Sequence, residues 1–332
     1  MAPPPPSAQP QPVRRLSPAS SQRPQLPPEL LTQFAPLTAV LTLVERIAPT
    51  DSPVMILGEP GTGKTLLARA IHAASRRGGA LVEVDASALP TDLLDLELFG
   101  HERGDSHGVS GRKAGALELG AHGTVLIDEI AALGHTAQIK LLSALGKGSF
   151  NRSGGKRRVG LTARLISATA HPIAPMVRDG RFNEDLFEGL RTAHVELPPL
   201  RDRRTDIPFL AQQFAAQFGG LRAPRLSPQA VAVLEGHDWP GNVRELRTVV
   251  ERAVMAAHGA EIQARDLTFL VSNGAAGIGA PLRLSELERR HIQAVLRQTQ
   301  WHQGRAAALL GISCKTLYRK IREFGFERPV GA

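Results

Sequence analysis

The octapeptide Gly58-Glu59-Pro60-Gly61-Thr62-Gly63-Lys64-Thr65 decides the fold of this chain. It matches the pattern G-x-x-x-x-G-K-[ST] in full, follows an apolar run at residues 54–57 and precedes apolar residues at helical spacing. Glycines let backbone N–H groups turn toward phosphate oxygens, and the helix that follows directs its positive dipole end there. The motif predicts that all eight residues bind a nucleotide, with Lys64 at the β- and γ-phosphates and the Thr65 hydroxyl on Mg²⁺. The alternative is a glycine-rich turn that binds nothing.

A second apolar run, at residues 125–127, ends in the two acids Asp128 and Glu129. A phosphate-binding loop needs an acidic strand end beside it, so the pair is predicted to be catalytic. Asp128 would bind Mg²⁺, and Glu129 would polarise an attacking water. A third run ends in Thr169, which is either a sensor of the γ-phosphate or an ordinary β-branched strand residue.

Short apolar runs recur at residues 54–57, 81–84, 125–127 and 165–168, with helical spacing between them. Strands that alternate with helices predict an α/β fold, a parallel sheet with helices on both faces. From about residue 206 to 270 the strand-like runs stop and apolar residues recur every three or four positions, which predicts a smaller all-α domain.

The two ends of the chain differ in composition. Residues 1–28 hold ten of the 25 prolines, which predicts a disordered or polyproline-II leader, either a solvated tail or a docking segment. Residues 272–281 are predicted to be a linker. Residues 282–328 carry ten Lys or Arg and four Asp or Glu, so 10 − 4 = +6 of the chain's net charge of +9 lies there.

This basic block is predicted to bind DNA. A small-residue helix at 304–310, a turn at 311–313 and a third helix at 314–324 give the helix–turn–helix pattern, whose last helix fits the major groove. The alternative is a basic, solvated helix at a chain end. The residues expected nearest the DNA are Arg305, Lys315, Thr316, Tyr318, Arg319 and Lys320.

Composition excludes several classes of protein. The single cysteine excludes a disulfide framework within the chain and a cysteine-rich zinc site. No run of 18 apolar residues is present, so neither a membrane-spanning helix nor a membrane partner is expected. The proline-rich start does not resemble a secretory signal, and we expect a cytoplasmic protein.

Further motifs carry a resemblance to a known family. They are Glu97-Leu98-Phe99-Gly100-His101-Glu102, Leu197-Pro198-Pro199-Leu200-Arg201 and Trp239-Pro240-Gly241-Asn242-Val243-Arg244-Glu245-Leu246. Together with the loop and the acidic strand, they resemble the AAA+ domain of bacterial enhancer-binding proteins, the sigma-54-interacting transcription activators. The C-terminal block resembles the Fis-type helix-turn-helix of that family.

The resemblance implies a division of the chain and several partners. The leader at 1–28 would be followed by an AAA+ α/β subdomain at 29–203, a helical lid at 204–271, the linker at 272–281 and the DNA-binding domain at 282–328. Arg244 would contact ATP from the lid, and Arg152 would lie in a second surface loop. Double-stranded DNA, RNA polymerase and other copies of the chain, as a dimer or a hexameric ring, are the implied partners.

The chain departs from the family at two functional segments. The sigma-contacting loop of the family reads GAFTGA, and residues 104–109 here read Gly-Asp-Ser-His-Gly-Val. Two arginines that the family supplies to a neighbour's γ-phosphate are replaced by Asn183 and Gly189, with Arg181 and Arg191 nearby. Asp85 stands where the family has an asparagine that switches the catalytic glutamate, and Ala170 stands after Thr169 where a polar residue is usual.

Two interpretations follow. In one, the chain is an ATP-hydrolysing activator that remodels sigma-54 polymerase. In the other, it binds ATP and DNA, hydrolyses ATP weakly or not at all, and regulates transcription without sigma-54. An arginine finger contributes about 10³–10⁵-fold in turnover, so the replacements favour the second interpretation.

Overall fold

The computed structural model describes residues 13–16, 32, 34–102, 112–257 and 259–267, and in the C-terminal part residues 288–289, 291–293, 295–296, 299, 301–324 and 326. The chain divides into two compact units, Met1–Val271 and Ser272–Ala332. The predicted sigma-contacting loop and the predicted linker lie outside the described residues.

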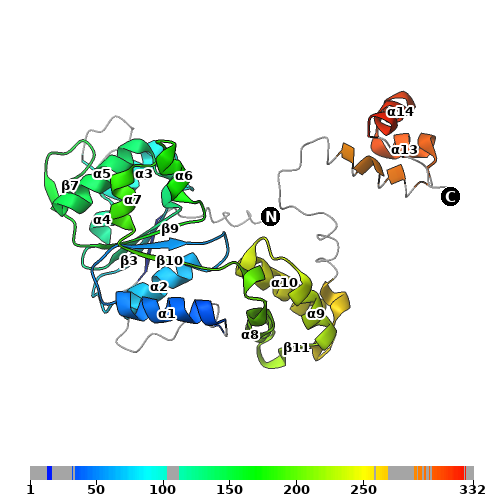
Figure 1. Ribbon diagram of the computed structural model, residues 1–332, viewed down its shortest axis with the longest axis horizontal. Helices are drawn as coiled ribbons and strands as arrows, with labels where there is room; N and C mark the ends of the chain where they lie inside the picture. Colours follow the sequence, from blue (N-terminus) through cyan, green and yellow to red (C-terminus); the bar gives the residue numbers. More distant parts are fainter. Residues whose placement is uncertain are drawn as a thin grey trace, which may run out of the picture. The chain divides into compact units, whose positions relative to one another are not determined.

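A six-stranded sheet forms the centre of the first unit (Figure 1). Its order is β1 (Val13–Leu16), β3 (Leu81–Asp85), β6 (Thr124–Asp128), β9 (Arg164–Thr169), β2 (Val54–Leu57) and β10 (Ala193–Glu196). All neighbours are parallel except β1 and β3, which are antiparallel. The predicted parallel α/β sheet is therefore confirmed.

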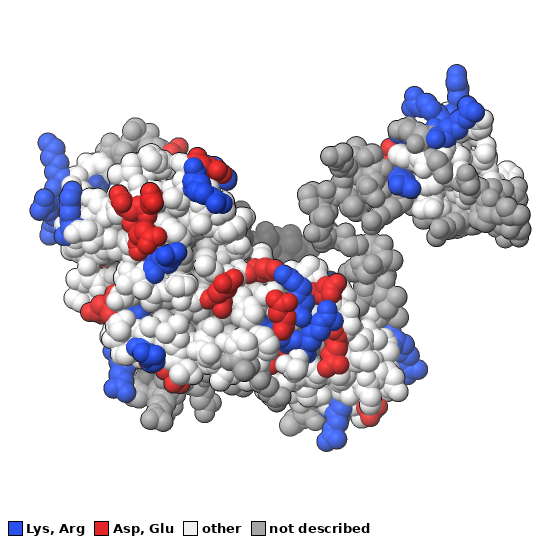
Figure 2. Space-filling view, viewed as in Figure 1, with Lys and Arg blue, Asp and Glu red and all other residues white. Residues whose placement is uncertain are grey.

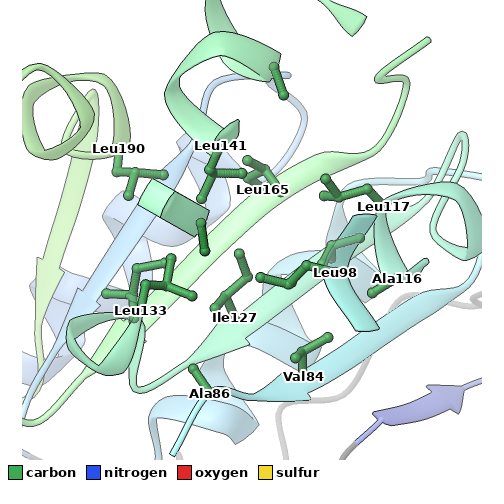
Figure 3. Close-up of a cluster of buried hydrophobic side chains, with 14 of the residues drawn as sticks. Val84, Ala86, Leu98, Ala116, Leu117, Ile127, Leu133, Leu141, Leu165 and Leu190 are labelled. Atoms are coloured by element: carbon green, nitrogen blue, oxygen red, sulfur yellow. The ribbon is translucent and has the colours of Figure 1, made fainter. Parts of the chain in front are cut away.

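The alternation of side chains along the strands gives the sheet two buried faces. Met55, Val84 and Ile127 face one cluster, shown in Figure 3, whereas Ile56 and Leu126 face the other. The first cluster is covered by α3 (Thr91–Phe99), α4 (Ala116–Leu119), α5 (His135–Lys147), α6 (Ile173–Arg178) and α7 (Glu184–Leu190). The second is covered by α1 (Ala35–Ile47) and α2 (Lys64–Ala74).

Strand β1 corrects one prediction from composition. Residues 13–16 fall in the segment predicted as a disordered leader, yet they pair with β3, with Val13 opposite Val84. An edge strand offers unpaired N–H and C=O groups, and a short segment with apolar ends can satisfy them. A prediction from the average composition of residues 1–28 does not detect a four-residue strand within them, because the prolines dominate that average.

Two antiparallel hairpins lie beside the main sheet. One pairs β4 (Gly100–His101) with β5 (Lys113–Ala114), and the other pairs β7 (Ser149–Asn151) with β8 (Arg158–Gly160). Short 3₁₀ turns occupy Ile130–Ala132, Leu200–Asp202, Arg204–Asp206, Gly220–Arg222 and Ala264–Leu267.

The helical part of the first unit contains α8 (Ile207–Gly219), α9 (Pro228–Gly236) and α10 (Asn242–Ala256), with β11 (Arg225–Leu226) beside β12 (Glu261–Ile262). These helices enclose a core of their own around the fully buried Trp239. The predicted all-α lid is thus present, apart from the two-residue strands.

The second unit contains α13 (Gln303–Leu310) and α14 (Cys314–Glu323). Ser313 caps α14 by accepting a hydrogen bond from the backbone of Thr316. Leu317 on α14 and Ala306 on α13 are buried in a small core with Ile292 and Leu296. In the part of the chain that the structure describes, no helix is long and apolar enough to cross a membrane.

Candidate nucleotide-binding site and DNA interface

A cleft of about 390 Å³ lies between the octapeptide loop and the helical lid. Its walls come from the loop, from the ends of β3 and β6, and from α8 and α10 of the lid. The lining residues that the sequence predicted are Pro60, Gly61, Gly63, Lys64, Thr65, Asp128, Glu129 and Arg244. Gly58, Glu59, Thr62 and Thr169 do not line this cleft.

The loop offers backbone donors for an anion. Among the described residues, the N–H groups of Gly61, Gly63, Lys64 and Thr65 find no acceptor, whereas those of Gly58 and Thr62 do. Gly61 and Gly63 adopt positive φ angles of 80° and 108°, which side chains disfavour. The Lys64 ammonium bonds the carbonyl oxygens of Gly58, at 2.9 Å, and Glu59, at 3.3 Å, so it is held within the loop. Backbone N–H groups without an acceptor and a lysine ammonium fixed within the loop are suited to binding a phosphate chain.

The predicted metal-binding pair is in contact. The Thr65 hydroxyl donates to Oδ2 of Asp128 at 3.0 Å. Burial raises the pKa of the Asp128 carboxyl, and the Thr65 hydroxyl and the Lys64 charge partly offset this shift. A buried carboxylate beside a hydroxyl is an oxygen donor set that suits Mg²⁺, and a bound cation would relieve the burial of the negative charge. The residues present therefore fit an Mg²⁺–nucleotide group.

Glu129 is held by the end of β9. Its carboxylate accepts hydrogen bonds from the backbone of Ala170, at 3.1 and 3.2 Å, and from the Thr169 hydroxyl at 3.4 Å. Nδ1 of His171 lies 3.3 Å from the same carboxylate. Thr169 is fully buried, so it reaches the cleft only through Glu129.

Asp85 makes a different contact from the one that the family pattern implies. Its carboxylate accepts hydrogen bonds from the backbone and hydroxyl of Ser87, at 2.9 and 2.6 Å. A second carboxylate cannot donate a hydrogen bond to Glu129 when both are ionised. The backbone of Ala170 provides that donor instead.

The lid contacts the loop through Asn242, at the start of α10. The Asn242 amide donates to Glu59, at 3.1 Å, and to the Pro60 carbonyl, at 3.0 Å, and its oxygen accepts from the backbone of Leu200 at 2.7 Å. Arg201 also forms an ion pair with Glu59, which lowers the pKa of that carboxyl. These contacts join the two walls of the cleft.

Arg244 extends from the same helix into the cleft, and its side chain is exposed. Its backbone donates to the Gly61 carbonyl at 3.3 Å. A Cβ on Gly61 would lie 2.2 Å from the Gly241 carbonyl oxygen, so only glycine permits this approach of lid and loop. The placement fits the predicted role of Arg244 in nucleotide contact.

The sequence alone did not identify several residues that shape the cleft. Arg247 and Phe214 line it from the lid, and Asn242 and Arg201 connect its walls. Arg247 stands three residues after Arg244 on α10, so helical spacing could have identified it. The role of Asn242 depends on its left-handed backbone, φ 52°, which no local pattern indicates.

The two positions without arginine lie on or beside α7. Asn183 is the N-cap of this helix, and its side chain accepts from the backbone of Leu186 at 2.8 Å. A Cβ on Gly189 would meet no atom within 4 Å. Asn183 therefore stabilises the start of α7, whereas Gly189 leaves open space where a side chain could stand.

The neighbouring arginines have local partners. Arg181 forms an ion pair with Asp179 at 2.8 Å. Arg191 lies 3.8 Å from Glu188 and stacks over the Phe187 ring, 5.2 Å from its centroid. Arg181 is thus paired just after α6, and Arg191 is held at the end of α7.

Five of the six residues predicted to contact DNA present an accessible face in the second unit. Arg305, Lys315, Tyr318 and Arg319 are exposed, and Thr316 is half-buried because its hydroxyl bonds Ser313. Lys320 is placed differently. Its ammonium bonds Glu288 at 2.9 Å and lies over the Phe324 ring, so it contributes to the packing of the module.

Three family descriptions match successive parts of the chain. Residues 30–196 match "Sigma-54 interaction domain", residues 201–278 match "AAA+ ATPase lid domain", and residues 283–324 match "Bacterial regulatory protein, Fis family". The three matches follow the order of the sheet, the lid and the C-terminal unit.

Individual relatives match over most of the chain. Regulatory protein AtoC of Escherichia coli K12 is 38% identical over 313 residues, which is 90% of this chain and 68% of AtoC. Transcriptional regulatory protein ZraR of the same organism is 38% identical over 85% of this chain and 66% of ZraR. NtrX from Brucella abortus in complex with ADP superposes with a TM-score of 0.69 at 35% identity, covering 90% of this chain and 70% of NtrX. The chain spans about two thirds of the length of these relatives.

Proposed function

The chain belongs to the family of transcriptional regulators that combine a sigma-54 interaction domain, an AAA+ lid and a Fis-type DNA-binding domain, and on that premise we propose that it is a nucleotide-gated DNA-binding regulator that does not drive sigma-54 polymerase. It binds ATP with Mg²⁺, hydrolyses ATP slowly, and acts on transcription independently of sigma-54.

Binding of ATP is supported by the cleft. Lys64 and the four unpaired N–H groups of the loop would hold the phosphates, Thr65 and Asp128 would hold Mg²⁺, and Arg244 would contact the nucleotide from the lid. NtrX from Brucella abortus has also been solved in complex with ATP, with a TM-score of 0.68 and 35% identity to this chain. Magnesium would neutralise phosphate charge when bound.

Slow hydrolysis is supported above all by the N-cap at Asn183. A side chain that caps its own helix cannot reach a neighbouring subunit, and an arginine at that position would have to give up the cap. In this proposal the chain assembles with other copies, as a dimer or a ring, without supplying a cation to the neighbour's γ-phosphate. Glu129 could still polarise a water, but the charge that develops on the phosphate would lack its guanidinium partner.

A sigma-54-dependent motor is the second candidate, and a specific observation favours it. The Thr65–Asp128 and Thr169–Glu129 hydrogen bonds would suit the activation of a water, and residues 30–196 match the sigma-54 interaction domain. The two candidates differ in whether the loop at 104–109 and α7 still transmit the energy of hydrolysis.

Open-complex formation with sigma-54 polymerase in vitro distinguishes the two candidates. One variant restores the family sequence at residues 105–107 and 109, a second carries Asn183→Arg with Gly189→Arg, and a third combines both sets. We expect no activity from the unchanged protein or from either partial variant, because two defects act in series, so only the combined variant should gain activity. Strong activation by the unchanged protein would show that the motor is intact.

Binding of duplex DNA through α14 is tested separately. Arg319→Ala should weaken specific binding by about ten- to a hundredfold, because a base contact contributes roughly 1–3 kcal/mol. Lys320→Ala is the matched comparison, since Glu288 already holds that ammonium within the module. Equal losses in both variants would mean that the exposed face of α14 does not read the bases.

A further inference from the structure

A second concentration of positive charge lies in the AAA+ unit, among residues that do not line the cleft. Residues 130–178 contain eight Lys or Arg and no Asp or Glu. Three of the cations are consecutive, Lys156, Arg157 and Arg158, and all three are exposed on the β7–β8 hairpin. Figure 2 shows Lys and Arg side chains gathered at the edge of the unit where Figure 1 places β7.

These three residues, here called the hairpin patch, have no ion-pair partner within the described part of the chain. Two nearby acids, Glu118 and Glu102, are instead bound to Arg152, which begins the connecting loop of the hairpin. Arg112, which is also exposed, adds positive charge close enough to lower the pKa of Glu118. The excess charge of the hairpin is therefore not neutralised locally.

The loop that joins the two strands of the hairpin is firmly held where it leaves β7. Arg152 is 5% exposed and donates to Glu118, at 2.6 Å, and to Glu102, at 2.5 Å, and these bonds raise its pKa. The backbone of Ser153 also donates to the Gly100 carbonyl at 2.9 Å. One arginine thus fixes the hairpin to the strand from which the segment 103–111 begins, while the three outer cations stay available to a ligand.

We propose that the hairpin patch is a second DNA-binding surface, which contacts the phosphate backbone of duplex DNA without reading its sequence. Consecutive cations without counterions suit phosphates, and such contacts contribute affinity and position rather than specificity. Duplex DNA is favoured over an acidic protein because the Fis-type domain of the same chain would bring DNA to a high effective concentration near the AAA+ unit.

The inference goes beyond the proposed function, since it holds whether or not the chain activates sigma-54 polymerase. It adds a contact between DNA and the part of the chain that binds nucleotide. The hairpin is joined to Gly100 and Glu102, so DNA on the patch would lie close to strand β4.

The test measures the affinity of the full chain for a duplex as a function of salt. Lys156→Gln, Arg157→Gln and Arg158→Gln are combined in one variant. Its matched control combines Arg222→Gln, Arg225→Gln and Arg252→Gln, three exposed cations of the lid. Each phosphate contact contributes about 0.9 to the slope of log affinity against log salt concentration, so the slope of the hairpin variant should be smaller by up to about 2.7. Between 50 and 200 mM salt, the affinity of the parent should therefore fall roughly 40-fold more than that of the variant.

Two further variants separate this proposal from DNA binding by α14. Lys315→Ala with Arg319→Ala weakens the recognition helix, and the hairpin variant should remove much of the binding that remains in that background. Arg157→Lys with Arg158→Lys keeps the charge and should retain the parental slope. Unchanged melting and ATP-analogue affinity would confirm that the fold is intact.

A hairpin variant whose slope equals that of the lid control overturns the proposal, whatever the α14 variants show. So does a hairpin variant that binds DNA as the parent does but loses binding to poly-glutamate, since the patch would then belong to an acidic protein partner.

Discussion

The phosphate-binding loop and helix α7 are the two regions that hydrolysis would require, and they differ in what their side chains do. At the loop, the Lys64 ammonium bonds the Gly58 carbonyl and the Thr65 hydroxyl bonds Asp128, an arrangement that fits a phosphate chain with Mg²⁺. At α7, Asn183 caps its own helix and Gly189 presents no side chain. Among the described residues no hydrogen bond or ion pair joins the loop to α7. The loop therefore has side chains suited to a nucleotide, whereas positions 183 and 189 of the α7 segment carry no cation.

Restoring the two arginines is the change with the largest expected effect. Asn183→Arg with Gly189→Arg should raise the single-turnover rate of ATP hydrolysis by about 10³-fold or more in the assembled protein, because an arginine finger stabilises charge in the transition state. Quenched-flow measurement of product formation from a stoichiometric complex gives this rate directly.

The lysine pair Asn183→Lys with Gly189→Lys is the control for that experiment. It adds the same charge without the planar fork of a guanidinium, so its gain should be much smaller. If neither pair alters the rate, α7 does not face a neighbouring γ-phosphate and the comparison between the two regions fails.

Lys64→Ala acts on the other region. Removing a charge-assisted contact should cost roughly 1.5–3 kcal/mol, which is about ten- to a hundredfold in ATP affinity. Titration of a fluorescent ATP analogue measures the change, and Lys147→Ala, an exposed lysine at the end of α5, is the matched control. Equal affinity of the parent and Lys64→Ala proteins would contradict a phosphate site at this loop.

Asn183→Ala has the smallest expected effect and sharpens the comparison. Loss of the cap should lower stability by about 1 kcal/mol. The melting temperature should fall by about 2–4 °C for a unit of this size. ATP affinity should not change. Asn183→Ser, which retains a capping oxygen, should melt close to the parent, and a loss of ATP affinity in Asn183→Ala would show that the two regions are coupled.

Local patterns predicted the sheet, which is confirmed, and several residues that line the cleft, whose role in nucleotide binding stays a prediction. The loop motif has fixed spacing, and the strands are apolar because both faces of a parallel sheet are buried, so both can be identified from short segments. The family resemblance supplied Arg244 and the replaced arginines, which spacing alone does not show.

Contacts between distant segments could not be predicted in this way. Asn242 bonds Glu59, which is 183 positions away in the sequence. Glu129 accepts a hydrogen bond from the backbone of Ala170, whereas the sequence indicated only that residue 170 lacks the usual polar side chain. Composition also missed β1, because its pairing with β3 depends on an available sheet edge. Among the residues of α14 predicted to contact DNA, Lys320 has its ammonium bound to Glu288, and the sequence does not show that these two residues meet.

We propose that this chain binds ATP but hydrolyses it slowly, and one paired measurement on the unchanged protein tests both properties. ATP affinity is determined by titration, and the single-turnover rate is determined on the same preparation with Mg²⁺ at saturating protein. The claim requires specific, Mg²⁺-dependent binding together with a rate that rises by orders of magnitude only when both arginines are restored. A fast single turnover in the unchanged protein, with no further gain from Asn183→Arg and Gly189→Arg, would contradict it.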